Sequence, residues 1–402
     1  MKFITFARMA FIFLALLTGL IFWQNPYFAR ATYNEFFTRW HFEMPPTSTT
    51  FVVQNICPRA IARVIRRAFP EYKVVFTEHP TETPHLILKN YYTPTHGHET
   101  AHVPYMAFSG EYASLRWKRF FPSGYPFLEI TANETEGENF IFMPYIAYGK
   151  TNLRKNLQEA MEKRPYSQPR PHQVVYISSH CVRERDQMFT LLRKRFQQQA
   201  YSLGKCMQTA SQRAEGNYHD LTPIYEQYNF GLAMENHDRK GYVTEKIMNA
   251  FEGGAIPIYW GDDVLAKKWF NPNAFISIKD FSSPKAAADV IYALSQDPQR
   301  LTSMLQAPLF KGGRIPPLLL INDDILTHEE EVILHKMGAK VRAAYESYIA
   351  HRNAQNPYFK ALAFKENIKS KLAHTALWRF VKSSLDGLDS MLFRWRAKDQ
   401  PM

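Results

Sequence analysis

Residues 228–261 read YNFGLAMENHDRKGYVTEKIMNAFEGGAIPIYWG, and their pattern decides the fold. The apolar run Tyr228–Met234 predicts a buried strand, and a polar turn follows it. A helix is expected over Thr244–Glu252, with the threonine as its N-cap and two glycines after its last residue. Ala255–Trp260 is again apolar and predicts the next strand. A strand, a helix and a strand in this order are typical of an α/β domain.

The first turn of the predicted helix carries Glu245 and Lys246, and it faces the carboxyl end of a strand. Backbone N–H groups and the helix dipole attract anions at such a position. Lys246 adds a positive charge suited to a phosphate, and Glu245 offers two acceptors suited to a ribose diol. Asn236 and Tyr242 supply further hydrogen-bonding groups. This arrangement indicates a nucleotide site, and an ordinary strand–turn–helix with a solvent-facing Glu–Lys pair is the alternative.

Strands and helices alternate over two regions, residues 48–160 and residues 161–325, and a polar segment with three prolines, residues 149–172, joins them. The strands expected in the first region are Thr50–Gln54, Tyr72–Thr77, His85–Lys89, Pro104–Phe108, Pro126–Thr131 and Phe140–Tyr145, with a helix over Pro58–Phe69. Further elements expected in the second region are the strands Gln173–Ser178 and Phe275–Phe281 and the helices Glu184–Gln199 and Pro284–Ser295. The sequence therefore predicts two α/β domains with parallel sheets and a ligand cleft between them.

Both ends of the chain suggest contact with a membrane. Residues 9–23 form an uncharged apolar run after two basic residues, which predicts a signal-anchor transmembrane segment over residues 1–24. A cleaved signal peptide and a buried helix are the alternatives. Residues 25–47 then form a stem. Residues 326–402 form a basic helical tail, expected either to lie on an anionic bilayer as an amphipathic helix or to pack on its own domain.

Composition excludes several classes of protein. The 402 residues are 46% hydrophobic, which excludes a disordered chain, and the net charge is +12. Because +7 of that charge lies in residues 331–402, and because no nucleic-acid-binding module is recognisable, a nucleic-acid partner is not expected. The three cysteines, Cys57, Cys181 and Cys206, allow at most one internal disulfide, which excludes a disulfide scaffold and disfavours a cysteine zinc site.

The string MENHDRKGYVTEKIMNAFEGGAIPIYWG, residues 234–261, closely resembles the C-terminal signature of glycosyltransferase family 10, the α-1,3/1,4-fucosyltransferases. That signature contains F-E-N, then Y-x-T-E-K, a helix and I/V-P-I-x-x-G. The resemblance implies a GT-B fold, in which two Rossmann-like domains face a central cleft and the C-terminal domain binds GDP-fucose. It implies donor binding by Asn236, Tyr242, Glu245 and Lys246. Glu245 resembles the ribose ligand, and Lys246 a phosphate ligand.

Two further segments resemble the family. VYISSHCVRERDQMFTLL, residues 175–192, places Arg185 on the arginine that contacts the pyrophosphate, with Arg183 as a competing register. MAFSGEY, residues 106–112, resembles an aromatic–T/S-G-E segment whose glutamate is the general base, which implies this role for Glu111. The competing carboxylates nearby are Glu129 and Glu134.

The resemblance implies a single displacement with inversion, which moves L-fucose from GDP-β-L-fucose to an acceptor hydroxyl, expected at GlcNAc O3 or O4. Glu111 would act as the base, and Arg185, Lys246 and the helix N-terminus would stabilise the departing GDP. The chain contains no D-x-D motif, so no cofactor is expected to be required and a divalent metal would be stimulatory only. His96 and His98 could chelate a metal, but we expect them to lie in an ordinary polar loop.

The expected partners are GDP-fucose, an acceptor glycan on a glycoprotein, glycolipid or lipopolysaccharide, and membrane lipid through the anchor and the tail. A eukaryotic source would place the protein in the Golgi membrane. A bacterial source would place it in the inner membrane with its catalytic body facing the cytosol. A relative that uses another nucleotide sugar and an inactive membrane-tethered sugar-binding relative are the alternatives.

Overall fold

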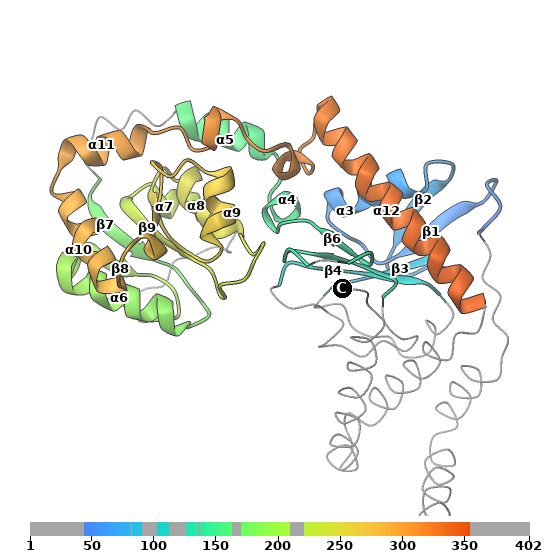
Figure 1. The fold of residues 1–402 in the computed structure, drawn as a ribbon, viewed down its shortest axis with the longest axis horizontal. Helices are drawn as coiled ribbons and strands as arrows, with labels where there is room; N and C mark the ends of the chain where they lie inside the picture. Colours follow the sequence, from blue (N-terminus) through green and yellow to red (C-terminus); the bar gives the residue numbers. More distant parts are fainter. Residues whose placement is uncertain are drawn as a thin grey trace, which may run out of the picture.

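The computed structural model describes residues 44–353, apart from residues 82, 91–102, 112–125, 136, 163–169 and 210–220. The expected anchor over residues 1–24, most of the expected stem and the tail beyond Asn353 lie outside this part of the chain. Within it, no helix combines the length and the apolar character needed to cross a membrane. Figure 1 shows two α/β domains side by side.

The N-terminal domain is built on a six-stranded parallel sheet with the strand order β2-β1-β3-β4-β5-β6. Its strands are β1 (Thr50–Gln54), β2 (Lys73–Thr77), β3 (Leu86–Lys89), β4 (Tyr105–Ser109), β5 (Leu128–Thr131) and β6 (Phe140–Phe142). The parallel arrangement confirms the prediction. The strand expected over Phe140–Tyr145 is shorter than predicted because Tyr145 already has helical backbone angles ahead of α4 (Ile146–Gly149).

The C-terminal domain has a five-stranded parallel sheet with the order β11-β10-β9-β7-β8. Its strands are β7 (His172–Tyr176), β8 (Ala200–Ser202), β9 (Tyr228–Met234), β10 (Ile256–Trp260) and β11 (Ile276–Ser277). Its helices are α6 (Arg183–Phe196), α7 (Thr222–Tyr225), α8 (Glu245–Glu252), α9 (Asp263–Trp269), α10 (Pro284–Ser295) and α11 (Pro298–Gln306). The strand order reverses between β7 and β9, and ligands of open α/β sheets bind outside the carboxyl ends of the strands at such a point.

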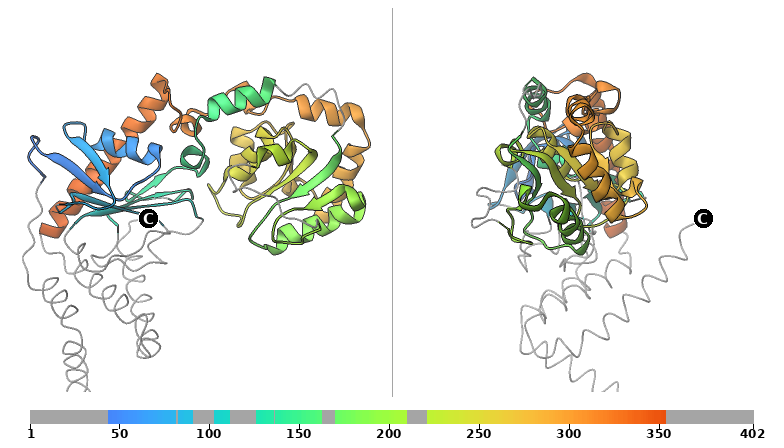
Figure 2. Two further views of the ribbon diagram at one scale, coloured as in Figure 1. Left: turned by 180° about the vertical axis from the view of Figure 1, so that it is seen from behind. Right: turned by 90° about the vertical axis from the view of Figure 1, so that its left-hand side faces the viewer.

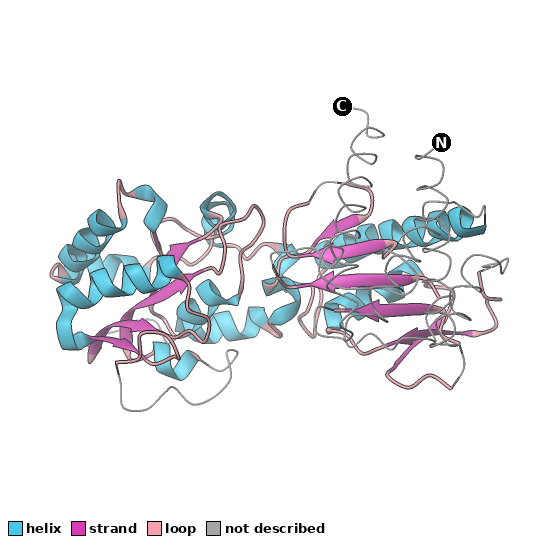
Figure 3. Ribbon diagram, turned by 90° about the horizontal axis from the view of Figure 1, so that it is seen from below, coloured by secondary structure: helices cyan, strands magenta, loops and turns pink. Residues whose placement is uncertain are grey.

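The helix α12 (His328–Asn353), at the start of the expected helical tail, packs in the core of the N-terminal domain, which was one of the two alternatives for the tail. Figures 2 and 3 show α12 lying along the N-terminal sheet. Leu334, Val341 and Tyr345 recur at helical spacing and are buried in the core of that domain. An apolar stripe therefore anchors this part of the chain, although the region as a whole is basic.

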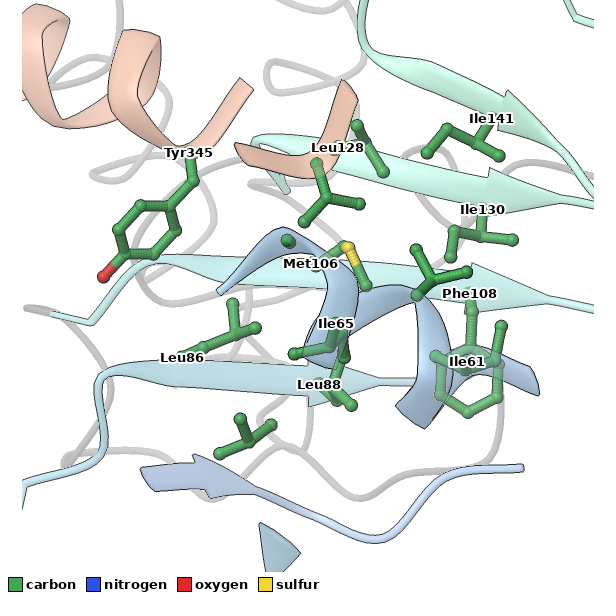
Figure 4. Close-up of a cluster of buried hydrophobic side chains, with 14 of the residues drawn as sticks. Ile61, Ile65, Leu86, Leu88, Met106, Phe108, Leu128, Ile130, Ile141 and Tyr345 are labelled. Carbon is green, nitrogen blue, oxygen red and sulfur yellow. The ribbon is translucent and has the colours of Figure 1, made fainter. Parts of the chain in front are cut away.

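The contact between α12 and α3 (Arg59–Ala68) is close. A Cβ atom on Gly338 would lie 2.7 Å from the backbone carbonyl carbon of Arg67, so only glycine allows the two helices to approach this far. The Arg67 guanidinium also donates to both carboxylate oxygens of Glu331 on α12. Figure 4 shows residues of α3, α12 and the central strands meeting in one cluster.

The chain passes between the domains twice, first through α4 and α5 (Leu153–Glu162) and later through residues 314–327, ahead of α12. Two residues of the second passage, Asn322 and Asp323, form hydrogen bonds to the backbone of the first passage. The Asn322 side chain donates to the backbone oxygen atoms of Tyr148 (3.2 Å) and Lys150 (2.7 Å). The Asp323 carboxylate accepts from the first backbone N–H groups of α5, at Leu153 and Arg154.

We expect Leu334→Ala to destabilise the protein by about 2–5 kcal/mol, because it removes a fully buried side chain from the N-terminal core. Val332→Ala is the matched control on the same helix. Its side chain is 36% exposed, so its effect should stay below about 1 kcal/mol. Urea unfolding of both variants measures the difference, and equal stabilities would contradict the packing of α12 described above.

Candidate active site

A cavity of about 920 Å³ lies between the carboxyl ends of the two sheets, and residues of both domains line it. Its volume lies within the range of small-molecule binding sites. All six residues predicted from the sequence line this one cavity: Glu111, Arg185, Asn236, Tyr242, Glu245 and Lys246. None of the three competing residues lines it: Arg183 is exposed, Glu129 is fully buried in β5, and Glu134 lies outside the cavity.

Arg185 is fixed in the wall of the cavity by neighbours from two segments, the end of β9 and the loop after β7. Its Nε donates to the backbone oxygen of Met234 at the end of β9 (2.8 Å), and its Nη2 donates to Asn236 Oδ1 (2.6 Å). Its Nη1 donates to Ser178 Oγ (3.1 Å). None of these partners is a carboxylate, so the buried guanidinium keeps a full positive charge that a bound anion can use.

Glu235 is a buried carboxylate behind the cavity wall that was not among the predicted site residues. Its two oxygens accept from the backbone N–H and the hydroxyl of Thr244, both at 2.7 Å. Glu235 Oε2 also accepts from the Lys246 ammonium at 3.2 Å. Thr244 precedes α8 as predicted, but its side chain makes no cap bond, because its hydroxyl is used by Glu235 and Lys246.

Lys246 is the charged centre of this cluster. Its ammonium lies 3.2 Å from Glu235 and 3.6 Å from Glu245. Burial opposes its charge, but the carboxylates of Glu235 and Glu245 outweigh burial and raise the pKa of Lys246 above its usual value. Burial also raises the pKa of Glu235, and the charge of Lys246 opposes that shift. The pair is therefore mutually dependent, and Lys246 is held as a cation at the first turn of α8.

Glu111 enters the cavity from the opposite domain, directly after β4. Its backbone N–H donates to Ser109 Oγ (3.1 Å), and Asn133 Nδ2 lies 3.5 Å from its backbone oxygen. Among the residues that the structure describes, Glu111 is the one carboxylate of the N-terminal domain that lines the cavity. Glu134 instead pairs with Lys240, at 3.4 Å on the outer surface.

The domains touch beside Tyr242, at Gly241. The backbone N–H of Glu134 donates to the oxygen of Lys240 at 3.0 Å across the interface. Gly241 has a φ of +84°, and a Cβ there would lie 2.1 Å from the Glu134 nitrogen. Only glycine therefore fits this contact, which brings the N-terminal loop after β5 to the turn that carries Asn236 and Tyr242.

A disulfide between Cys181 and Cys206 joins the loops that follow β7 and β8. Both loops contribute to the cavity, through Ser178 and Lys205 among others. The bridge accounts for two of the three cysteines and agrees with the single bridge that the sequence allows. It helps to fix Ser178, which in turn holds Arg185.

Comparison with known proteins identifies the C-terminal part of the chain. Residues 167–306 match the family model of glycosyltransferase family 10 (fucosyltransferase), C-terminal. The chain carries a family 10 glycosyltransferase domain. An alpha-(1,3)-fucosyltransferase of Helicobacter pylori is 39% identical over 89 residues, which are 22% of this chain and 18% of the relative. The GDP-fucose protein O-fucosyltransferase 3 of Bos taurus is 30% identical over 146 residues, which are 33% of this chain and 29% of the relative.

The matched part of the chain thus spans less than a third of the length of these two curated relatives. A solved alpha1,3-fucosyltransferase is similar over a larger extent. It matches with a TM-score of 0.51 at 17% identity, over 76% of this chain and 95% of its own. At this level of identity the likeness concerns the fold alone, and it confirms the predicted GT-B arrangement of two α/β domains.

The family 10 domain supplies most of the polar groups in the cavity. These groups do not form a metal site among the residues that the structure describes. No group of three His, Cys, Asp or Glu side chains suited to a metal occurs in the ranges that the structure describes. His96 and His98 lie outside those ranges. The expectation that no metal is required therefore stays a prediction.

We expect Lys246→Met to destabilise the protein by about 3–5 kcal/mol at neutral pH, because it leaves the buried Glu235 carboxylate without its cation. The pKa of Glu235 is already raised by burial and would rise further. A raised carboxyl pKa stabilises the folded state at low pH, and this contribution is lost as the pH rises through the folded pKa. The loss should therefore be smaller at pH 5 than at pH 8.

Urea unfolding at both pH values measures this effect. Lys240→Met is the matched control, because Lys240 also pairs with a carboxylate but is 67% exposed. It should change stability by no more than about 0.5 kcal/mol. A loss in Lys246→Met that is independent of pH would contradict the assigned charge coupling.

Proposed function

We propose that this protein is an inverting fucosyltransferase that moves L-fucose from GDP-β-L-fucose to a hydroxyl of an acceptor glycan, with GlcNAc O3 or O4 as the expected position. The observation that carries the proposal is the shared cavity. A carboxylate of the N-terminal domain, Glu111, lines the same space as two fixed cations of the family 10 domain, Arg185 and Lys246. The names of its relatives, which include a GDP-fucose-dependent enzyme, support this donor.

The proposed donor site uses the geometry at the carboxyl end of β9. The diphosphate would lie against Arg185, Lys246 and the first backbone N–H groups of α8. Glu245 would accept from the ribose hydroxyls, and Asn236 and Tyr242 would complete the pocket. Because Arg185 and Lys246 are held by protein partners before a ligand arrives, little reorganisation is needed when charge develops on the leaving group.

The chemical step would be a single displacement. The Glu111 carboxylate takes the proton of the acceptor hydroxyl, whose oxygen forms a bond to the anomeric carbon. The bond from that carbon to the diphosphate oxygen breaks, and its electron pair leaves with GDP. Attack on the face opposite to the leaving group converts the β-linked donor into an α-linked product. Arg185 and Lys246 stabilise the added negative charge on GDP.

Two alternatives share most of this site. A transferase for another nucleotide sugar would keep the ribose and diphosphate ligands and differ around the hexose. An inactive sugar-binding relative would bind the donor without turnover. The relatives also differ in acceptor, since one is named for α1,3 transfer and another for protein O-fucosylation, so the acceptor stays part of the proposal. Attachment to a membrane in the Golgi or the bacterial inner membrane stays a prediction for residues outside the described ranges.

We expect Glu111→Gln to lower kcat for acceptor-dependent GDP release from GDP-fucose by about 10²–10⁴-fold, because the amide cannot take the proton. The Kd of GDP should remain within about threefold of wild type, since Glu111 lies on the other domain. LacNAc-type acceptors and full-length protein serve in the assay.

Glu134→Gln is the matched control for this variant. Its carboxylate belongs to the same domain but lies outside the cavity, so the rate should stay near that of the wild type. A wild-type rate in Glu111→Gln would refute the assignment of the base. Binding of another nucleotide sugar in place of GDP-fucose would favour the first alternative.

We further expect activity to persist when EDTA removes divalent metals, because Arg185 and Lys246 would neutralise the diphosphate in place of a metal ion. Added Mg²⁺ or Mn²⁺ should raise the rate only a few-fold. Complete loss of turnover in EDTA, restored by one metal, would contradict this part of the proposal.

A further inference from the structure

The wall of the cavity includes a tyrosine whose buried hydroxyl has no partner in the proposed donor site. Tyr148, on α4, lines the cavity, and only 6% of its surface is exposed. Among the residues that the structure describes, its Oη has no hydrogen-bond partner. A buried hydroxyl without a partner destabilises a folded protein, so such groups are rare unless a ligand completes them.

The side chain of Tyr148 is held firmly in place. Its ring packs edge-on against Phe108 of β4 at a centroid distance of 6.5 Å, and against Tyr145 at 5.3 Å. Its backbone oxygen accepts from the buried amide of Asn322. Lys150, two residues later, is tied to Glu252 of α8 by a buried ion pair of 2.8 Å. The hydroxyl therefore has a fixed position on the segment that leads from one domain to the other.

This position lies beside the proposed base. The hydroxyl is 2.9 Å from the point where a Cβ on Gly110 would be, directly before Glu111. Burial raises the pKa of Tyr148 well above its usual value, and the charges of Glu111 and Glu245 add to this shift. Carboxylates of both domains thus lie near the hydroxyl, which stays protonated and can donate or accept a hydrogen bond.

We propose that Tyr148 binds the transferred sugar, through a hydrogen bond between its hydroxyl and a hydroxyl or ring oxygen of the hexosyl group of the nucleotide sugar. The inference rests on the proposed function and extends it. The nucleotide and diphosphate would be held by the C-terminal domain, and the acceptor would meet Glu111. The group between these two sites is the sugar that moves, and Tyr148 stands beside Glu111 on the segment that joins the domains.

The test compares two ligands in Tyr148→Phe, a change that removes only the hydroxyl. Calorimetry without acceptor gives the Kd of GDP-fucose and of GDP for the wild type and the variant. The expected result is a Kd for GDP-fucose about tenfold higher than in the wild type, with the Kd of GDP within twofold, because GDP lacks the sugar. The Tm without ligand should be equal to or above that of the wild type, since no protein hydrogen bond is lost.

Tyr259→Phe is the matched control. Tyr259, on β10, is fully buried, its hydroxyl has no partner among the described residues, and it does not line the cavity. This variant should change neither Kd. The same result in Tyr148→Phe, or an equal loss of GDP and GDP-fucose, would overturn the inference.

A different outcome would show that the Tyr148 hydroxyl positions Glu111 and does not bind the sugar. An unchanged Kd for GDP-fucose in Tyr148→Phe, together with a shifted acidic limb of the kcat/KM profile, would mean that Tyr148 positions the base, and this too would overturn the inference. Wild-type protein that binds GDP but not GDP-fucose would refute the proposed function itself, and the inference with it. The two failures are therefore distinguishable.

Discussion

The cavity depends on how the two passages of the chain between the domains are fixed to each other. Asn322 bonds the backbone of Ala60 in one domain and of Tyr148 and Lys150 at the joint, and Asp323 caps α5. Buried polar groups of this kind add little net stability compared with apolar packing, but they accept only one arrangement of their partners. The joint therefore fixes one relative placement of the two sheets, and the walls of the cavity follow from it.

This placement separates the chemical roles between the domains. The proposed base and the two proposed phosphate ligands would neutralise one another if they formed ion pairs on one mobile surface. Here Arg185 is held from behind by Met234 and Asn236, and Lys246 by the buried Glu235, all on the C-terminal domain. Glu111 is carried by the other domain. The space between them is kept for a ligand, which explains why a buried ion pair of modest net stability is useful at this point.

The sequence predicted elements whose signals are local. The apolar run of β9, the glycine pair after α8 and the following apolar strand mark their own ends, so β9 and α8 lie where expected. The sequence left open whether the tail packs on a domain or on a bilayer, because the partner of α12, α3, is some 260 residues away in the chain and no local signal reports that contact. Glu235 follows β9 directly and stands in the F-E-N position of the family, which could have singled it out. Its burial and its bond to Thr244 depend on tertiary contacts.

The proposed role of Tyr148 could not be predicted from the local sequence. In the sequence it is one aromatic residue after an apolar strand, and hydrophobic packing is the ordinary role of such a residue. Its ring does pack in that way, against Phe108 and Tyr145. Only the crossing of the chain at α4 brings its side chain into the wall of a cavity that two domains enclose. A phenylalanine would pack equally well and leave no buried polar atom unpaired, so packing alone does not account for the hydroxyl, whereas a polar ligand in the cavity does.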